Sequence, residues 1–173
     1  MEKVTASEVD AAALSGTADR LDVSRALDAD HVTVMYYDVP PGDVLSAGYH
    51  THNDQEELFV VLEGTATFMT EAGDLRLGEG EAVRFGRGEF QHGYNDESEP
   101  LVALAIGAPP GMADTEAVFV CEGCEQRARH DVVLEDGLSA VCWACGERNA
   151  WPPERHRYLG IDPDPETAAG VDN

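Results

Sequence analysis

Apolar and polar residues alternate in short runs through the middle of the chain. The run 31–39 is rich in β-branched and aromatic residues, and the turn sequence Pro-Pro-Gly-Asp at 40–43 ends it. Further runs of the same kind, separated mostly by glycine-containing turns, occupy residues 57–62, 65–70, 75–77, 81–85 and 101–106. Many short strands with glycine turns between them predict an all-β sandwich or barrel.

The segments on either side of this predicted barrel have a different character. Residues 1–30 contain helix-start signals, which predict one or two short helices in an otherwise extended segment before the barrel at 31–107. Residues 108–117 are rich in Pro, Gly and Ala and predict a linker, and residues 118–160 hold all four cysteines in a module too small to bury a core alone. Residues 161–173 lack basic and aromatic residues and predict a disordered acidic tail.

The charge of the chain is strongly negative, with 34 acidic and 11 basic residues and a net charge of −23. This balance argues against a nucleic-acid-binding barrel and against electrostatic binding to a membrane surface. Lys3 is the only lysine, and the acidic residues are spread along the chain, a composition that resembles proteins of salt-accumulating haloarchaea. An acidic surface for a basic partner is the alternative explanation. No targeting signal or membrane span is recognisable, so a cytoplasmic location is expected.

A histidine cluster lies where the chain enters an apolar strand. His50 and His52, two positions apart on an extended segment, point to the same face, and Glu57 can return to that face across a bend. Two imidazoles and one carboxylate form a ligand set for a divalent first-row metal that leaves positions open for substrate or water. The alternative is a pair of solvent-exposed histidines in a polar loop, but the apolar run 58–62 favours a metal site.

At this point the sequence resembles the cupins, which are small double-stranded β-helix, or jelly-roll, barrels. Gly42 opens the first cupin motif, His50 and His52 form its HxH, Glu57 is its acid, and Gly64 is its closing glycine. The resemblance covers roughly residues 31–107. It implies a cupin barrel with a divalent metal, either Fe, Mn, Ni or Zn.

The second cupin motif is matched only in part. Gly88 and Asn95 are in register, but Gln91 stands where the histidine ligand is usual, and His92 comes one position later. A one-residue offset on a strand turns a side chain to the opposite face unless a bulge intervenes. Gln91 could therefore supply a carbonyl oxygen or a hydrogen bond beside three ligands, or a bulge could turn His92 inward as the fourth.

The resemblance does not name a reaction, because cupins include dioxygenases, isomerases, regulators and storage proteins. It implies a small, oxygen-rich ligand that the barrel binds and transforms by oxidation or isomerisation, or else senses without catalysis. It also implies a homodimer, since cupins commonly pair through strand edges. Tyr36, Tyr37, Tyr49, Tyr94 and Arg84 are further candidates at the barrel mouth, with ordinary strand packing as the alternative for the tyrosines.

The four cysteines form two CxxC pairs, Cys121/Cys124 and Cys142/Cys145, with 17 residues between them. A CxxC turn presents two thiolates to one ion, and a spacer of this length lets a hairpin bring the pairs together into tetrahedral coordination. This spacing is typical of a zinc ribbon with one structural zinc. Two disulfides, or a redox-active CxxC, are the alternatives, and a cytoplasmic setting and the paired spacing disfavour them.

The cysteine module differs from the barrel in charge. Residues 118–160 carry a net charge of only −2 and include Trp143 and Trp151, the only tryptophans. This region is therefore the best candidate for contact with a protein or a nucleic acid. The alternative is that the tryptophans pack the module onto the barrel.

Overall fold

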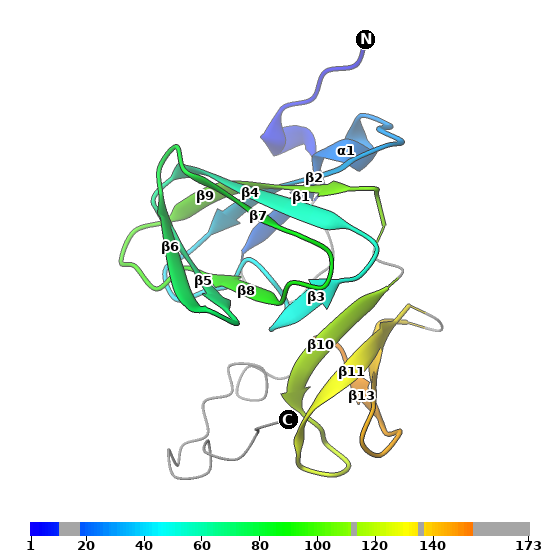
Figure 1. The fold of residues 1–173 in the computed structure, drawn as a ribbon. Coiled ribbons are helices and arrows are strands. Elements are labelled where there is room, and N and C mark those ends of the chain that lie inside the picture. The colour runs from blue at the N-terminus through cyan, green and yellow to red at the C-terminus, as the bar shows by residue number, and fades with distance from the viewer. Residues whose placement is uncertain (11–17, 112–113, 135–136, 154–173) are drawn as a thin grey trace.

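A computed structural model describes residues 1–10, 18–111, 114–134 and 137–153. The predicted tail at 161–173 and the end of the predicted ribbon at 154–160 lie outside the described residues. Two antiparallel sheets make up nearly all of the regular structure (Figure 1). Among the helices in the described ranges, none is long and apolar enough to cross a membrane.

The first sheet has five strands in the order β1-β2-β9-β4-β7. A 3₁₀ turn, η1, and a one-turn helix, α1, accompany it near the N-terminus, and the Asp22 carboxylate caps α1 by accepting from the Arg25 N–H. β1 is a strand within a segment for which the sequence predicted short helices. The bounds are η1 Ala6–Glu8, β1 Asp19–Asp22, α1 Val23–Ala26, β2 Thr33–Val39, β4 Glu56–Glu63, β7 Ala82–Phe85 and β9 Leu101–Ala108.

The second sheet has eight strands in the order β13-β12-β11-β10-β3-β8-β5-β6. Its last four members complete the barrel, and β10 to β13 continue the same sheet into the cysteine module, which extends from the barrel beside β3 (Figure 1). The bounds are β3 His50–His52, β5 Thr65–Thr70, β6 Gly73–Gly78, β8 Gln91–Tyr94, β10 Thr115–Val120, β11 Arg127–Val133, β12 Ser139–Cys142 and β13 Arg148–Ala150.

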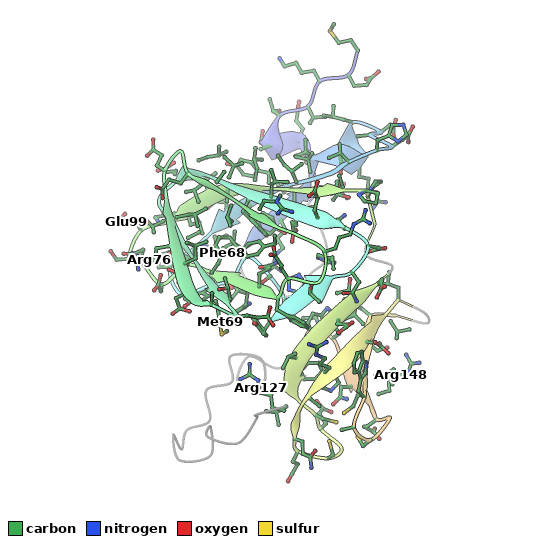
Figure 2. The ribbon with its side chains drawn as sticks, viewed as in Figure 1. Phe68, Met69, Arg76, Glu99, Arg127 and Arg148 are labelled. Carbon is green, nitrogen blue, oxygen red and sulfur yellow. The ribbon has the colours of Figure 1, made fainter. Side chains whose placement is uncertain are left out.

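The barrel core lies between the two sheets. Alternate residues of the strands point inward, as in β9, where every second side chain is buried. Three aromatic rings occupy the centre: Phe59 lies 4.8 Å from Phe68 and 6.1 Å from Phe85, measured between ring centroids, and Phe68 projects between the sheets (Figure 2). These features confirm the predicted all-β barrel fold with a small C-terminal cysteine module.

The junction between barrel and module differs from the predicted linker at 108–117. β9 runs to Ala108 and β10 begins at Thr115, so regular structure enters this segment from both sides. A second apolar cluster, which includes Val44, Phe119 and Trp151, packs the module against the barrel. Residues 112–113 lie outside the described residues. The module is therefore joined to the barrel by strand pairing and by side-chain packing, in addition to the covalent chain connection.

Gly64, the closing glycine of the first motif, is required by backbone geometry. Its φ is +80°, a region that side chains with a Cβ rarely adopt. A Cβ at this position would lie 2.5 Å from the carbonyl oxygen of Pro100. The turn between β4 and β5 can therefore approach the start of β9 only with glycine here.

Candidate metal sites

The barrel site is assembled from both sheets. His50 and His52 lie at the two ends of the short strand β3, and Glu57 reaches them from β4 in the opposite sheet. One ligand atom from each of these three side chains lies within 4.8 Å of the other two. The two imidazole rings meet edge to face at 83°, with centroids 5.0 Å apart. The structure thus brings together the three side chains that the first motif singled out.

Hydrogen bonds fix which imidazole nitrogen faces the site. His50 donates from Nδ1 to the carbonyl oxygen of Gly48 at 2.8 Å, and Nδ1 of His52 lies 3.0 Å from the Thr115 hydroxyl oxygen. With Nδ1 of each ring engaged in this way, Nε2 is the ring nitrogen that remains to bind a metal; for His50 the carbonyl partner also fixes the lone pair on Nε2. Nε2 of His52 lies 3.8 Å from the Glu57 carboxylate.

Burial keeps both imidazoles neutral at pH 7. It lowers the pKa of His50, and it lowers that of His52 to about 3 with a smaller contribution from His50. Burial also raises the pKa of Glu57 to about 7, and the hydrogen bond from Gln91 only partly opposes this rise. His52 and Glu57 consequently do not form a true ion pair by themselves. A divalent cation at this position would favour the Glu57 carboxylate and use the neutral imidazoles.

Gln91, and not His92, faces the barrel site. Gln91 pairs with His50 across β3 and β8, and its Nε2 lies 3.4 Å from His50 Nε2 and donates to Glu57 Oε2 at 3.1 Å. His92 is fully buried on the other face of β8, where its Nδ1 lies 3.0 Å from the Ser46 hydroxyl oxygen and its ring packs near Tyr94. β8 follows the regular alternation of a strand here, so the alternative with a bulge at His92 does not occur.

A small pocket opens beside these ligands. It is lined by Thr51, Gln55, Phe85, Gly86 and Glu89 together with His52, Glu57 and Gln91. Sequence reasoning did not select the first five. Gln55 and Glu89 brace the pocket wall, because Gln55 donates to the carbonyl oxygens of Pro109 and Gly111 and Glu89 accepts from the Gly86 N–H. The one available signal was that all five lie within the two motifs or next to them.

The residues present fit a divalent metal. Nitrogen and carboxylate oxygen donors of this kind suit first-row transition metals. Gln91 Oε1 is also buried, and it has no hydrogen-bond partner among the described residues. Buried polar atoms are nearly always hydrogen-bonded, so a cation with bound water or substrate would satisfy the acceptor that the protein leaves open.

The further candidates at the barrel mouth are placed differently. Tyr37 belongs to the barrel core, where burial raises its pKa and the nearby Glu57 charge raises it further. Arg84 points outward and pairs with Glu56 at 3.3 Å, so it does not line the pocket. The ring of Tyr49 packs against that of Phe90. Arg84 is therefore not a substrate-orienting residue, and Tyr37 lies near enough to the site for Glu57 to affect its pKa.

The second site is the cysteine cluster, built from two turns with the same backbone pattern. In the first turn the Cys121 N–H donates to the Gln126 carbonyl and the Glu125 N–H donates back to Cys121. In the second, Cys142 and Gly146 make the equivalent bonds. Glu125 and Gly146 occupy equivalent positions in the two turns, and both have a positive φ. The turn pattern therefore explains why Glu125, a residue other than glycine, adopts this unfavourable conformation.

The four sulfur atoms lie within 4.8 Å of one another and none is disulfide-bonded. Cys121 Sγ is 3.7 Å from Cys145 Sγ, close to the separation of about 3.8 Å that Zn–S bonds of about 2.3 Å give in a tetrahedron. Although burial opposes ionisation, hydrogen bonds from the Cys124 and Gly123 backbone and from Asn149 lower the pKa of Cys121 to about 5. The cluster is thus arranged to hold a cation and has no disulfide.

The fold and the first site together define a cupin-type barrel with a candidate metal centre. Residues 35–107 match the protein-family model described as "Cupin domain", which agrees with the two motifs. No curated protein matches this sequence. The family match covers the barrel and leaves the cysteine module outside it.

Several solved structures have a fold similar to that of this chain. A sugar phosphate isomerase from a cupin superfamily, from Silicibacter pomeroyi, superposes with a TM-score of 0.67 at 16% identity, over 84% of this chain and 95% of its own. The polyketide cyclase RemF from Streptomyces resistomycificus gives 0.60 at 22% identity, over 70% and 88%. A predicted oxalate decarboxylase from Thermotoga maritima gives 0.55 at 20%, over 63% and 100%. At these identities the likeness shows the fold alone.

Proposed function

We propose that the barrel binds one divalent transition metal through His50, His52 and Glu57 and uses it to bind and transform a small oxygen-rich metabolite. The observation that carries this proposal is the convergence of the three ligand atoms, from two sheets, beside a pocket where the buried side-chain oxygen of Gln91 has no partner among the described residues. Such a set leaves coordination positions open, and two oxygens of a substrate fit them.

The protein residues have distinct parts in this proposal. His50 and His52 present neutral Nε2 atoms, and the amide of Gln91 holds the Glu57 carboxylate in place. Gln91 also keeps a buried side-chain oxygen at the pocket, where it can accept a hydrogen bond from a substrate hydroxyl or from a bound water. The metal would supply Lewis-acid or redox chemistry. The apolar core behind Phe85 limits access of water from the interior side.

The reaction class is isomerisation or oxidation. Among the solved structures of the same fold, one is named a sugar phosphate isomerase and one a polyketide cyclase, and both act on oxygen-rich molecules according to those names. An inert ion such as zinc would support isomerisation, whereas iron would support oxidation. Metal identity therefore separates the two classes before any substrate is known.

We propose in addition that the cysteine cluster holds one structural zinc. Four thiolates fill a tetrahedral site and leave no position for a substrate, so this ion would act in folding. Exposed Cys145 completes the cluster at the surface, while buried Cys121 and Cys142 anchor it to β10 and β12.

The proposal is tested by elemental analysis of the purified protein. We expect about one zinc from the cysteine cluster and about one further metal ion from the barrel. Changing both His50 and His52 to Ala should remove the second metal and leave the first. A single metal per chain that persists in the double variant would refute the barrel site. Size-exclusion chromatography with light scattering tests the expected homodimer.

A regulatory role for the module is the second candidate. Trp143 is 54% exposed, and the guanidinium of Arg129 lies 5.8 Å from the centroid of its ring. Arg127 and Arg148 project from the same module (Figure 2). An exposed tryptophan beside an arginine is typical of a contact surface for another macromolecule. Binding of nucleic acid by the full chain at high salt would support this role. Metal-dependent turnover without such binding would reject it. Trp151, in contrast, packs the module to the barrel, as the alternative for the tryptophans predicted.

A further inference from the structure

One strand, β10, runs from the barrel site to the cysteine cluster. On one side it pairs with β3, so that Thr115 lies opposite His52 and Ala117 opposite His50. On the other side it pairs with β11 along its whole length. The strand ends at Val120, and the next residue is the first cysteine of the cluster. The two sites are thus connected by six residues of hydrogen-bonded strand, about 20 Å of extended chain.

The contact of β10 with the barrel site is made by a side chain. The Thr115 hydroxyl lies 3.0 Å from Nδ1 of His52, and Thr115 is only 4% exposed. For His50 the corresponding bond goes to a backbone carbonyl of its own loop, at Gly48. His52 therefore differs from His50 in that its orientation depends on a residue 63 positions away, on a strand of the cysteine module.

Further contacts hold β10 in this position. Asn53, which follows His52, donates from its amide to the carboxylates of Asp114 and Glu116 at 3.0 and 2.7 Å, and its backbone N–H donates to the Asp114 carbonyl. On the module side, Ala117 and Phe119 lie in the apolar cluster that includes Trp151. If the module became less ordered, β10 would lose part of its pairing and packing, and the position of Thr115 would be less well defined.

We propose that Thr115 is a positioning residue for the barrel metal, and that the metal-loaded cysteine module stabilises β10 so that the barrel binds its own metal tightly. This inference rests on the proposed function, since it requires both sites to bind metal. In this role the Thr115 hydroxyl accepts a hydrogen bond from Nδ1–H of His52 and so keeps Nε2 as the ligand atom. Because coupling between two sites is reciprocal, filling the barrel site also raises the affinity of the cysteine cluster.

The first test changes Thr115 alone. Thr115→Val removes the hydroxyl with little change of shape, and Thr115→Ser keeps it. The barrel affinity for Co²⁺, measured by chelator competition in the full chain with zinc in the cluster, should fall about 10- to 100-fold for Val and be restored by Ser. The control Thr67→Val removes an equally buried hydroxyl, bonded to Asp96, that touches neither site.

A spectroscopic readout separates positioning from general stability. In long-range ¹H–¹⁵N spectra of the metal-free barrel, His52 should be the Nδ1–H tautomer in the wild type, in Thr115→Ser and in Thr67→Val, and a mixture of tautomers in Thr115→Val. An unchanged tautomer together with unchanged Co²⁺ affinity in Thr115→Val would overturn the inference. If the wild type binds no second metal, the proposed function fails instead.

The second test perturbs the module. Cys145→Ser removes the exposed ligand of the cluster, and Ala144→Ser places the same hydroxyl one residue earlier with all four cysteines intact. Barrel affinity for Co²⁺ should fall about 5- to 150-fold in Cys145→Ser and remain at the wild-type value in Ala144→Ser. Equal affinity in both variants would overturn the coupling. Should Cys145→Ser unfold the whole chain, the zinc affinity of the cluster is compared in Thr115→Val and Thr115→Ser: by reciprocity it should fall in Val alone, and equal values would overturn the coupling.

Discussion

Replacing Gln91 with histidine should tighten metal binding in the barrel. Gln91 is 2% exposed, and its amide nitrogen lies 3.1 Å from the Glu57 carboxylate and 3.4 Å from Nε2 of His50. An imidazole has a similar reach and would add a nitrogen ligand among the existing three. We expect metal affinity to rise about 10- to 100-fold, or about 1.4–2.8 kcal/mol.

Removing the amide of Gln91 measures how much its hydrogen bond to Glu57 contributes to metal binding. Gln91→Leu removes the hydrogen bond to the Glu57 carboxylate while keeping a buried side chain of similar volume. A hydrogen bond to a charged group contributes about 1.5–3 kcal/mol, so metal affinity should fall by about 10-fold or more. Both variants are measured by chelator competition with Co²⁺, whose visible spectrum also reports the number of nitrogen ligands.

His92→Gln serves as the matched control, because His92 lies on the other face of β8 against Ser46. It should leave the barrel metal content unchanged. Two results would refute the reasoning: Gln91→His binding no more tightly than the wild type, or His92→Gln losing the metal. Either would mean that the faces of β8 are assigned the wrong way round.

Three further predictions concern stability. Phe59→Ala, in the centre of the barrel core, should lower the free energy of unfolding by about 3–5 kcal/mol in urea denaturation, whereas Leu75→Ala on the surface should change it by less than about 0.5 kcal/mol. Gly64→Ala should lower the melting temperature measured by calorimetry, because its Cβ would meet Pro100; an unchanged value would contradict the contact. Raising sodium chloride from about 0.1 M to about 2 M should raise the melting temperature, since a Debye length of only a few ångströms screens the net charge of −23; a fall would argue against adaptation to salt.

The sequence by itself determined those features that depend on local spacing. Alternation of apolar residues predicted β2, β4, β5, β6, β7 and β9 nearly as they occur, because side chains alternate across a strand. The HxH spacing placed His50 and His52 together for the same reason. The cysteine cluster was also predicted from the spacing of the two CxxC pairs and the hairpin between them. Each CxxC turn is held by hydrogen bonds within its own few residues, so local sequence is enough to specify it.

Only the tertiary structure decided what depends on the pairing of distant segments. Gln91 faces the site because β8 pairs with β3 without a bulge at His92. Glu57 meets the histidines because the two sheets close over one another. Thr115 reaches His52 because the supposed linker pairs into the barrel sheet, which makes the cysteine module a continuation of that sheet. Register between strands far apart in sequence is set by packing and closure of the whole sheet, and no local pattern contains it.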